Sequence, residues 1–252
     1  MKIFHVAIDG PAGSGKSTIS ALIAKKLNWT HIDTGAMYRA VTLFALENKI
    51  DLNDEKAYRF LETINISYLN DKIFLDGKDV SKEIRSDAVT DNVSLVSSFA
   101  YVRKKMVEIQ QECAVGLNVV MDGRDIGTVV LPNANLKVFL TANVEERAKR
   151  RYAETKKNED ESLLDEIIED IKIRDKKDST RKESPLKKAD DAIELDTTYL
   201  TIEEVVDKII LMIKENEWDG YKSTKSRRHY RRKGNTGREQ YHLFGYSVFH
   251  RS

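Results

Sequence analysis

Residues 10–18, GPAGSGKST, constrain the fold of this 252-residue chain more than any other stretch. They fit the pattern G-x-x-x-x-G-K-[ST]. An apolar, strand-like run over residues 2–8 precedes them, and apolar residues at helical spacing over 17–27 follow. Glycines let such a loop curl so that its N–H groups point at phosphate oxygens, and the helix offers its positive end to the same anion. The sequence therefore predicts a binding site for a nucleoside triphosphate.

Two side chains of this loop have expected roles. Lys16 can reach the β- and γ-phosphates, and Ser17 can place its hydroxyl on a Mg²⁺ ion bound with ATP. GTPases, ATPases and small-molecule kinases all use such a loop, so it indicates the donor and not the reaction. The loop residues expected to bind ATP are Gly10, Pro11, Ala12, Gly13, Ser14, Gly15, Lys16, Ser17 and Thr18.

Strand-like and helical segments alternate along the chain, which predicts an α/β fold with a parallel β-sheet flanked by helices. Ligands bind such sheets at the carboxyl ends of the strands. Further strands are expected over residues 29–33, 117–121, 136–140 and 192–195, and further helices over 36–47, 87–97, 102–115, 145–157, 163–177 and 202–214.

Two segments depart from this rhythm. Alternating apolar residues over 64–69 and 72–75, around Asn70–Asp71, predict a β-hairpin, and we interpret residues 56–86 as a small insert. The two charge-rich helices that follow are joined by a short link and carry Arg147, Arg150 and Arg151. They suggest a lid over about residues 147–181 that closes over phosphates and excludes water.

The composition argues against a membrane or secreted protein. No apolar run approaches the roughly 18–20 residues of a membrane span, and the N-terminal run lacks a small-residue cleavage site. The single cysteine, Cys113, permits no intramolecular disulfide. We therefore expect a cytoplasmic protein without a membrane partner.

Charge is unevenly divided along the chain. Residues 221–252 hold nine Lys or Arg and one acid, Glu239, so they carry +8 while the rest carries −7 of the net +1. We expect one domain over residues 1–220 and a basic, disordered tail over 221–252. Aromatic residues lie among the cations, so RNA binding by the tail is one alternative. Another alternative is that the tail is a segment foreign to the rest of the chain.

Two segments near expected strand ends suit a second phosphate-bearing ligand. Residues 33–39, DTGAMYR, place hydroxyls and Arg39 at a helix start, although a simple helix cap with a solvated arginine gives the same pattern. Residues 121–128, MDGRDIGT, place Asp122 directly after a buried strand, where it can bind Mg²⁺ through water. Arg124 can bind a phosphate and Asp125 can accept from an exocyclic amine; the alternative is a turn with local ion pairs.

The third segment, residues 174–181, has the pattern R-D-x-x-D-x-x-R. At helical spacing Arg174, Asp178 and Arg181 lie within about 60° of one another on one face. They can form a cationic site, or a solvent-exposed ladder of ion pairs that contributes little.

Over about residues 3–214 the chain resembles the bacterial cytidylate kinases, the (d)CMP kinases of the nucleoside monophosphate kinase group. The resemblance implies a P-loop kinase core with a small β-containing insert that binds the nucleoside monophosphate (NMP) and a helical lid. It also implies ATP and CMP or dCMP as partners, and we expect a monomer. The resemblance rests on GPAGSGKST, DTGAMYR, VSLVSSFAYVR (residues 93–103), MDGRDIGTVVLP, the R-D-x-x-D-x-x-R helix, SPL (184–186) and ADDAIELDTT (189–198).

The resemblance also implies site residues. Arg39 and Arg124 would hold the acceptor phosphate, Ser94, Arg103 and Asp125 would contact the cytosine edge, and Arg174 and Asp178 would lie at the ribose. Arg150 joins the residues expected to bind ATP, and Lys16, Arg124 and Arg174 form the expected catalytic set. The expected CMP-binding set is Thr34, Tyr38, Arg39, Ser94, Arg103, Arg124, Asp125, Arg174, Asp178 and Arg181.

Two other functions remain compatible with the motifs. One is a P-loop kinase of another small acceptor, such as UMP, AMP or a shikimate-like compound. The other is an NTP-binding protein whose basic tail binds RNA.

Overall fold

The computed structural model describes residues 3–69, 72–154 and 162–216. The chain divides into two units, Met1–Ile213 and Lys214–Ser252; of the second only residues 214–216 are described, and they are helical. The elements are β1 (His5–Asp9), α1 (Lys16–Leu27), β2 (Thr30–Asp33), α2 (Thr34–Glu47), η1 (Glu55–Glu62), β3 (Ile66–Leu69), β4 (Lys72–Leu75), β5 (Lys78–Asp79), η2 (Glu83–Arg85), α3 (Asp87–Val96), α4 (Ala100–Cys113), β6 (Val119–Gly123), η3 (Ile126–Val130), β7 (Leu136–Thr141), α5 (Val144–Glu154), α6 (Ser162–Thr180), β8 (Ile193–Asp196) and a C-terminal helix over residues 202–216.

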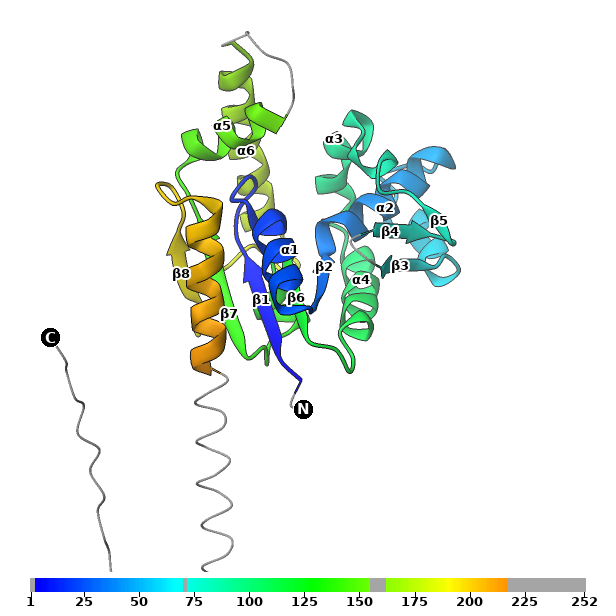
Figure 1. Ribbon diagram of the computed structural model, residues 1–252. Helices are drawn as coiled ribbons and strands as arrows, with labels where there is room; N and C mark the ends of the chain where they lie inside the picture. Colours follow the sequence, from blue (N-terminus) through cyan, green and yellow to red (C-terminus); the bar gives the residue numbers. More distant parts are fainter. Residues whose placement is uncertain (1–2, 70–71, 155–161, 217–252) are drawn as a thin grey trace, which may run out of the picture. The chain divides into compact units, whose positions relative to one another are not determined.

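The central sheet is parallel throughout and has five strands in the order β2-β6-β1-β7-β8. Because all strands run the same way, their carboxyl ends lie along one edge. The loop that leads to α1 leaves from that edge at the end of β1, and α2 begins there directly after β2 (Figure 1). The expected α/β fold with a parallel sheet is therefore confirmed.

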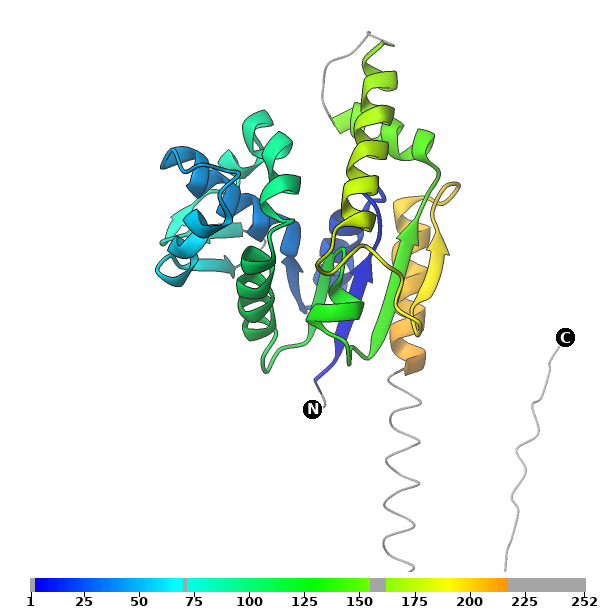
Figure 2. The same cartoon turned by 180° about the vertical axis from the view of Figure 1, so that it is seen from behind.

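Alternate residues of the inner strands enter two separate apolar cores. Val6, Ile8 and Val120 pack with α1 and the C-terminal helix, which lie in front of the sheet in Figure 1. Ala7 and Met121 face the other side and join a core shared with α2, α3 and α4; Figure 2 shows α4 and α6 on this side. Both faces of the sheet are thus covered, as its apolar strands require.

The insert forms a second, antiparallel sheet in the order β3-β4-β5, and its apolar side chains belong to the same core as α2. The predicted hairpin is confirmed as β3 and β4, although its turn, Asn70–Asp71, lies outside the described residues. The short strand β5 was not predicted because two residues, Lys78–Asp79, carry no detectable periodicity.

Some predicted boundaries were wrong for a physical reason. The strand expected over 117–121 continues as β6 through Asp122 and Gly123, because its parallel pairing with β1 lasts to the Asp9–Gly123 pair. The helix expected over 163–177 runs to Thr180. The end of the helix expected over 145–157 and the tail over 221–252 lie outside the described residues. Within the described part of the chain, no helix is long and apolar enough to cross a membrane.

The first loop glycine is required by a close approach of two strands. Gly10 follows β1 with φ +155°, and a Cβ there would lie 2.1 Å from the carbonyl oxygen of Leu140 in the neighbouring strand β7. Gly116 also has a positive φ, +77°, but a Cβ there would meet no atom within 4 Å.

We expect Gly10→Ala to lower the free energy of unfolding by more than about 3 kcal/mol, because the clash is with backbone that cannot move cheaply. Gly116→Ala, the matched control, has only the left-handed backbone cost of about 1 kcal/mol. Urea unfolding of both variants measures the difference. Equal losses of unfolding free energy would show that the close approach of β1 and β7 does not require glycine at position 10.

Candidate active site

A cavity of about 610 Å³ opens at the carboxyl ends of β1, β2 and β6. Its lining comes from segments far apart in the sequence: the phosphate loop, α2, α3, the segment after β6, the helices α5 and α6, and the stretch after β8. The predicted residues that line it are Ala12, Gly13, Gly15, Lys16, Ser17, Thr18, Thr34, Tyr38, Arg39, Ser94, Arg103, Asp122, Arg124, Asp125, Arg150, Arg174, Asp178 and Arg181.

Three predicted loop residues, Gly10, Pro11 and Ser14, do not line the cavity but shape the loop behind it. The Lys16 ammonium donates to the carbonyl of Pro11 at 2.6 Å and to the Ser14 hydroxyl at 3.2 Å. Burial, together with Arg124 and Arg174 nearby, holds the pKa of Lys16 well below its usual value. A bound anion would relieve this strain on the charged form, as a phosphate site requires.

One buried carboxylate, Asp122 at the end of β6, joins the two sides of the cavity. Its Oδ2 accepts from the Ser17 hydroxyl at 2.7 Å, and its Oδ1 lies 2.7 Å from Nε2 of His31 in β2. Its backbone carbonyl accepts from the Thr34 hydroxyl at 2.8 Å. Hydroxyl and carboxylate oxygens, paired at the start of α1, form the kind of donor set that Mg²⁺ prefers.

A second buried carboxylate, Asp9, organises the loop that follows β6. It accepts from the backbone N–H groups of Ile126 at 2.8 Å and Gly127 at 2.7 Å. Burial raises its pKa to about 6, and the two backbone bonds only partly oppose this rise. Asp9 thus fixes the position of Asp125, the residue directly before this contact.

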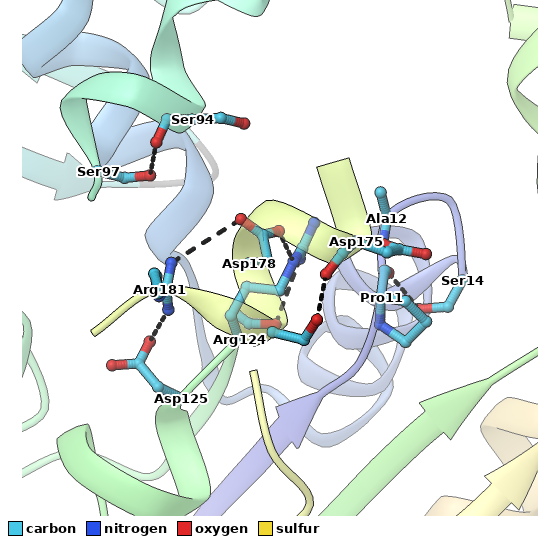
Figure 3. Close-up of polar contacts among 12 residues, drawn as sticks. Pro11, Ala12, Ser14, Ser94, Ser97, Arg124, Asp125, Asp175, Asp178 and Arg181 are labelled. Atoms are coloured by element: carbon cyan, nitrogen blue, oxygen red, sulfur yellow. Dashed lines mark hydrogen bonds and ion pairs between the residues drawn. The ribbon is translucent and has the colours of Figure 1, made fainter. Parts of the chain in front are cut away.

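Asp125 lies between two arginines at the far end of the cavity. Its Oδ2 accepts from Arg103 at 2.5 Å. Its Oδ1 lies 3.7 Å from Arg181, as Figure 3 shows. The Arg103 guanidinium also lies 5.3 Å from the ring centre of Tyr38, a cation–π contact. Burial raises the pKa of the Tyr38 hydroxyl to about 12, so this group stays a neutral donor.

Arg124 and α6 meet in the middle of the cavity. The Arg124 guanidinium donates to Asp178 at 2.9 Å (Figure 3). Burial alone would raise the pKa of Asp178, but Arg124, Arg174 and Arg181 bring it below its usual value. Asp178 is 6% exposed, so the alternative of a solvent-exposed ion-pair ladder is wrong.

Arg174, also in α6, has a guanidinium group whose positive charge is poorly compensated. Its Nε is buried and has no hydrogen-bond partner among the described residues. Burial, then repulsion from Arg124, lowers the pKa of Arg174 to about 9. By contrast, Arg39 already donates to the carbonyl of Ile84 and, at 2.8 Å, to the hydroxyl of Thr90 in α3.

The helix α6 also touches the phosphate loop directly. Asp175 accepts from the backbone N–H of Ala12 at 2.9 Å and from Arg147 of α5 at 2.5 Å. Arg147 in turn donates to the Ala12 carbonyl at 2.8 Å. Both charge-rich helices are therefore fastened to the tip of the loop.

The opposite end of the cavity is less charged. Arg150 of α5 donates to the carbonyl of Thr197 at 2.7 Å and to its hydroxyl at 3.1 Å, so its planar group is held still. Leu200, Ile202 and Val205 add apolar surface beside it. A flat cation next to apolar side chains suits an aromatic base.

Comparisons with known proteins agree with this geometry. A sequence profile described as cytidylate kinase matches residues 6–215. The chain belongs to the cytidylate kinase family. A cytidylate kinase from Acholeplasma laidlawii is 61% identical over 210 residues, 83% of this chain and 95% of that protein. One from Fusobacterium nucleatum is 56% identical over 205 residues, 81% of this chain and 94% of that protein.

A solved gluconokinase from Sinorhizobium meliloti has a TM-score of 0.44 at 16% identity, and the match covers 87% of this chain and 97% of that one. A likeness this distant carries no argument about this chain, and the family assignment rests on the sequence matches alone. The family places the chain among nucleoside monophosphate kinases, and the alternative kinases of other acceptors are not favoured.

Sequence reasoning missed several residues of this cytidylate kinase-family site. Asp9 was detectable, because an acid at the end of a buried strand directly before a phosphate loop is unusual. Asp175 lay inside a quoted motif without a role. His31 gave no signal at all, and the wall formed by Thr197 and its neighbours belongs to a turn whose position depends on the fold.

We expect Asp9 to make unfolding pH-dependent. Its pKa in the folded protein lies above the ordinary value, so the folded state binds more protons and this contribution to stability is lost as pH rises through about 6. The free energy of unfolding of the protein should fall relative to Asp9→Asn by up to about 3 kcal/mol between pH 4 and pH 7. Urea titrations at each pH measure this. If the difference in unfolding free energy between the two proteins stayed constant across this range, the raised pKa of Asp9 would be contradicted.

Proposed function

We propose that this protein transfers the γ-phosphoryl group of ATP to CMP or dCMP, producing ADP and CDP or dCDP. The observation that carries the proposal is one cavity in which the phosphate loop faces Arg124, Arg174 and Arg181. Membership of the cytidylate kinase family supports the choice of acceptor.

On the donor side, we assign the phosphates to the backbone of the loop and to Lys16, with Arg150 beside the base. Lys16 exchanges its internal bond to the Pro11 carbonyl for the β- and γ-phosphates. Ser17 directly, and Asp122 through water, would hold the Mg²⁺ ion, because their oxygens suit a hard cation. When bound, the ion supplies positive charge to the β- and γ-phosphate oxygens.

On the acceptor side, we assign the cytosine edge to Ser94, Arg103 and Asp125, with Thr34 and Tyr38 lining the pocket. Arg39 and Arg124 would hold the acceptor phosphate, and Arg174 and Asp178 the ribose and its surroundings. Arg181 adds charge near the phosphates. Insert residues 56–86 act here as the NMP-binding part and residues 147–181 as the lid.

The reaction then depends on position and charge. An oxygen of the CMP phosphate is already anionic at neutral pH, so no strong general base is needed. Lys16, Arg124 and Arg174 neutralise charge as the phosphoryl group passes between the two phosphates. The lid helices, fastened to the loop through Asp175, exclude water that would otherwise hydrolyse ATP.

We further propose that the protein acts as a cytoplasmic monomer. The tail over residues 221–252 lies outside the described residues, and the assigned site residues all fall within Met1–Ile213. The proposed reaction therefore uses no residue of the tail.

A coupled ADP-release assay over CMP, dCMP, UMP, AMP and shikimate tests the function. We expect CMP and dCMP to give the highest kcat/KM, and Lys16→Ala to lower kcat by at least about 100-fold, because charge on the transferred group is left unneutralised. Lys26→Ala, at an exposed helical lysine, is the control. A different preferred acceptor, or near-normal turnover by folded Lys16→Ala, would refute the proposal.

Asp125 should set the preference for cytosine over uracil. Its carboxylate accepts from the 4-amino group of cytosine but faces an oxygen at that position in uracil, and an unmatched buried acceptor is costly. An amide can serve both bases, so Asp125→Asn should lower the CMP/UMP ratio of kcat/KM about tenfold or more. The exposed Asp190→Asn should keep the ratio; an unchanged ratio in Asp125→Asn would remove this residue from the base site.

A further inference from the structure

His31 is a buried imidazole that the proposed reaction does not use. It lies in the middle of β2, and its side chain is only 5% exposed. Its Nε2 lies 2.7 Å from Oδ1 of Asp122, 91 residues further along the chain. A histidine on an apolar strand is often only a core residue. This one contacts the carboxylate that accepts from Ser17, which suggests a role in the site.

The parallel register explains how this contact is reached. His31 pairs with Val120 and Asp33 with Asp122, so His31 lies two residues before the strand end and its ring extends toward the cavity edge. The ring of Tyr68, from the insert strand β3, lies against it at 6.0 Å and 82°, an edge-to-face contact. The imidazole is therefore held on two sides, by the core sheet and by the insert.

The bonding of Asp122 is divided between its two oxygens. Oδ1 lies at His31 and Oδ2 accepts from the Ser17 hydroxyl at 2.7 Å. At 2.7 Å a hydrogen must lie between the two atoms, and we assign it to Nε2 of His31, which then donates to Oδ1. A hydrogen bond to each oxygen holds the carboxylate group in one rotation.

We propose that His31 is a positioning residue for the metal-bearing side of the donor site. By holding Oδ1, it keeps Oδ2 turned toward Ser17, where the Mg²⁺ of the nucleotide is expected, and it leaves the carboxylate no other orientation. The proposal rests on the proposed function for the metal and the donor, and not on the identity of the acceptor.

Three substitutions of His31 separate positioning from packing. In His31→Gln the side-chain amide places an N–H donor near the position of the imidazole Nε2, whereas His31→Leu keeps apolar bulk without any donor. His31→Asn carries the same amide on a shorter side chain that does not reach Asp122. His5→Leu, a histidine substitution at the start of β1, serves as the control.

The readout is Mn²⁺ binding to the full-length enzyme with saturating ATP, measured from the electron paramagnetic resonance of free Mn²⁺. We expect His31→Leu and His31→Asn to weaken Mn²⁺ binding about tenfold, as loss of an orienting partner does at other metal sites. His31→Gln should stay within threefold of the unchanged protein, and His5→Leu should not differ from it. Affinity for ATP without metal should change less than twofold in all four.

Each other outcome overturns the proposal. If His31→Asn and His31→Leu bind Mn²⁺ as the unchanged protein does, Asp122 needs no orientation. If His31→Gln is as weak as His31→Leu, the ring acts through packing; should His31→Leu fail to fold, His31→Asn is compared with His31→Gln in its place. The titration contains no acceptor, so an error in the assigned acceptor would appear in the kinase assay and not here.

Discussion

The site depends on a cluster of positively charged side chains held at the carboxyl ends of the strands of one parallel sheet. Lys16, Arg124 and Arg174 share a buried cavity, and burial together with their mutual repulsion lowers the pKa of Lys16 and of Arg174. Three acids, Asp122, Asp125 and Asp178, offset part of this charge. The positive charge that remains suits the binding of anions, of which phosphate groups are one kind.

The acids do more than neutralise, because each one fixes a cation or a hydroxyl in direction. Asp125 aims Arg103, Asp178 aims Arg124, and Asp122 takes the Ser17 hydroxyl. Asp9 has a different task, since it accepts two backbone N–H groups and so sets the loop that carries Asp125. A site for phosphoryl transfer gains from such preorganisation, because the groups need not reorient during the reaction.

The sequence predicted what depends on neighbours in the chain and missed what depends on distant partners. The loop, the strand and helix order and the hairpin follow from local spacing, and all appear in the structure. Resemblance to a family supplied Arg103, whose pairing with Asp125 no spacing reveals. The contacts of His31 and Asp175 span 91 and 163 residues, and they exist only because the parallel strands and the charge-rich helices α5 and α6 bring distant segments together.

The two halves of the cavity are mechanically joined through α6. Asp175 accepts from the phosphate loop at Ala12, and Asp178, three residues later, accepts from Arg124. Residues one turn apart on a helix keep their relative positions, so Arg174 is aimed by contacts on both sides at once. A shift of the loop at Ala12 would therefore also move Arg174, so the geometries of the two sides of the cavity cannot vary independently.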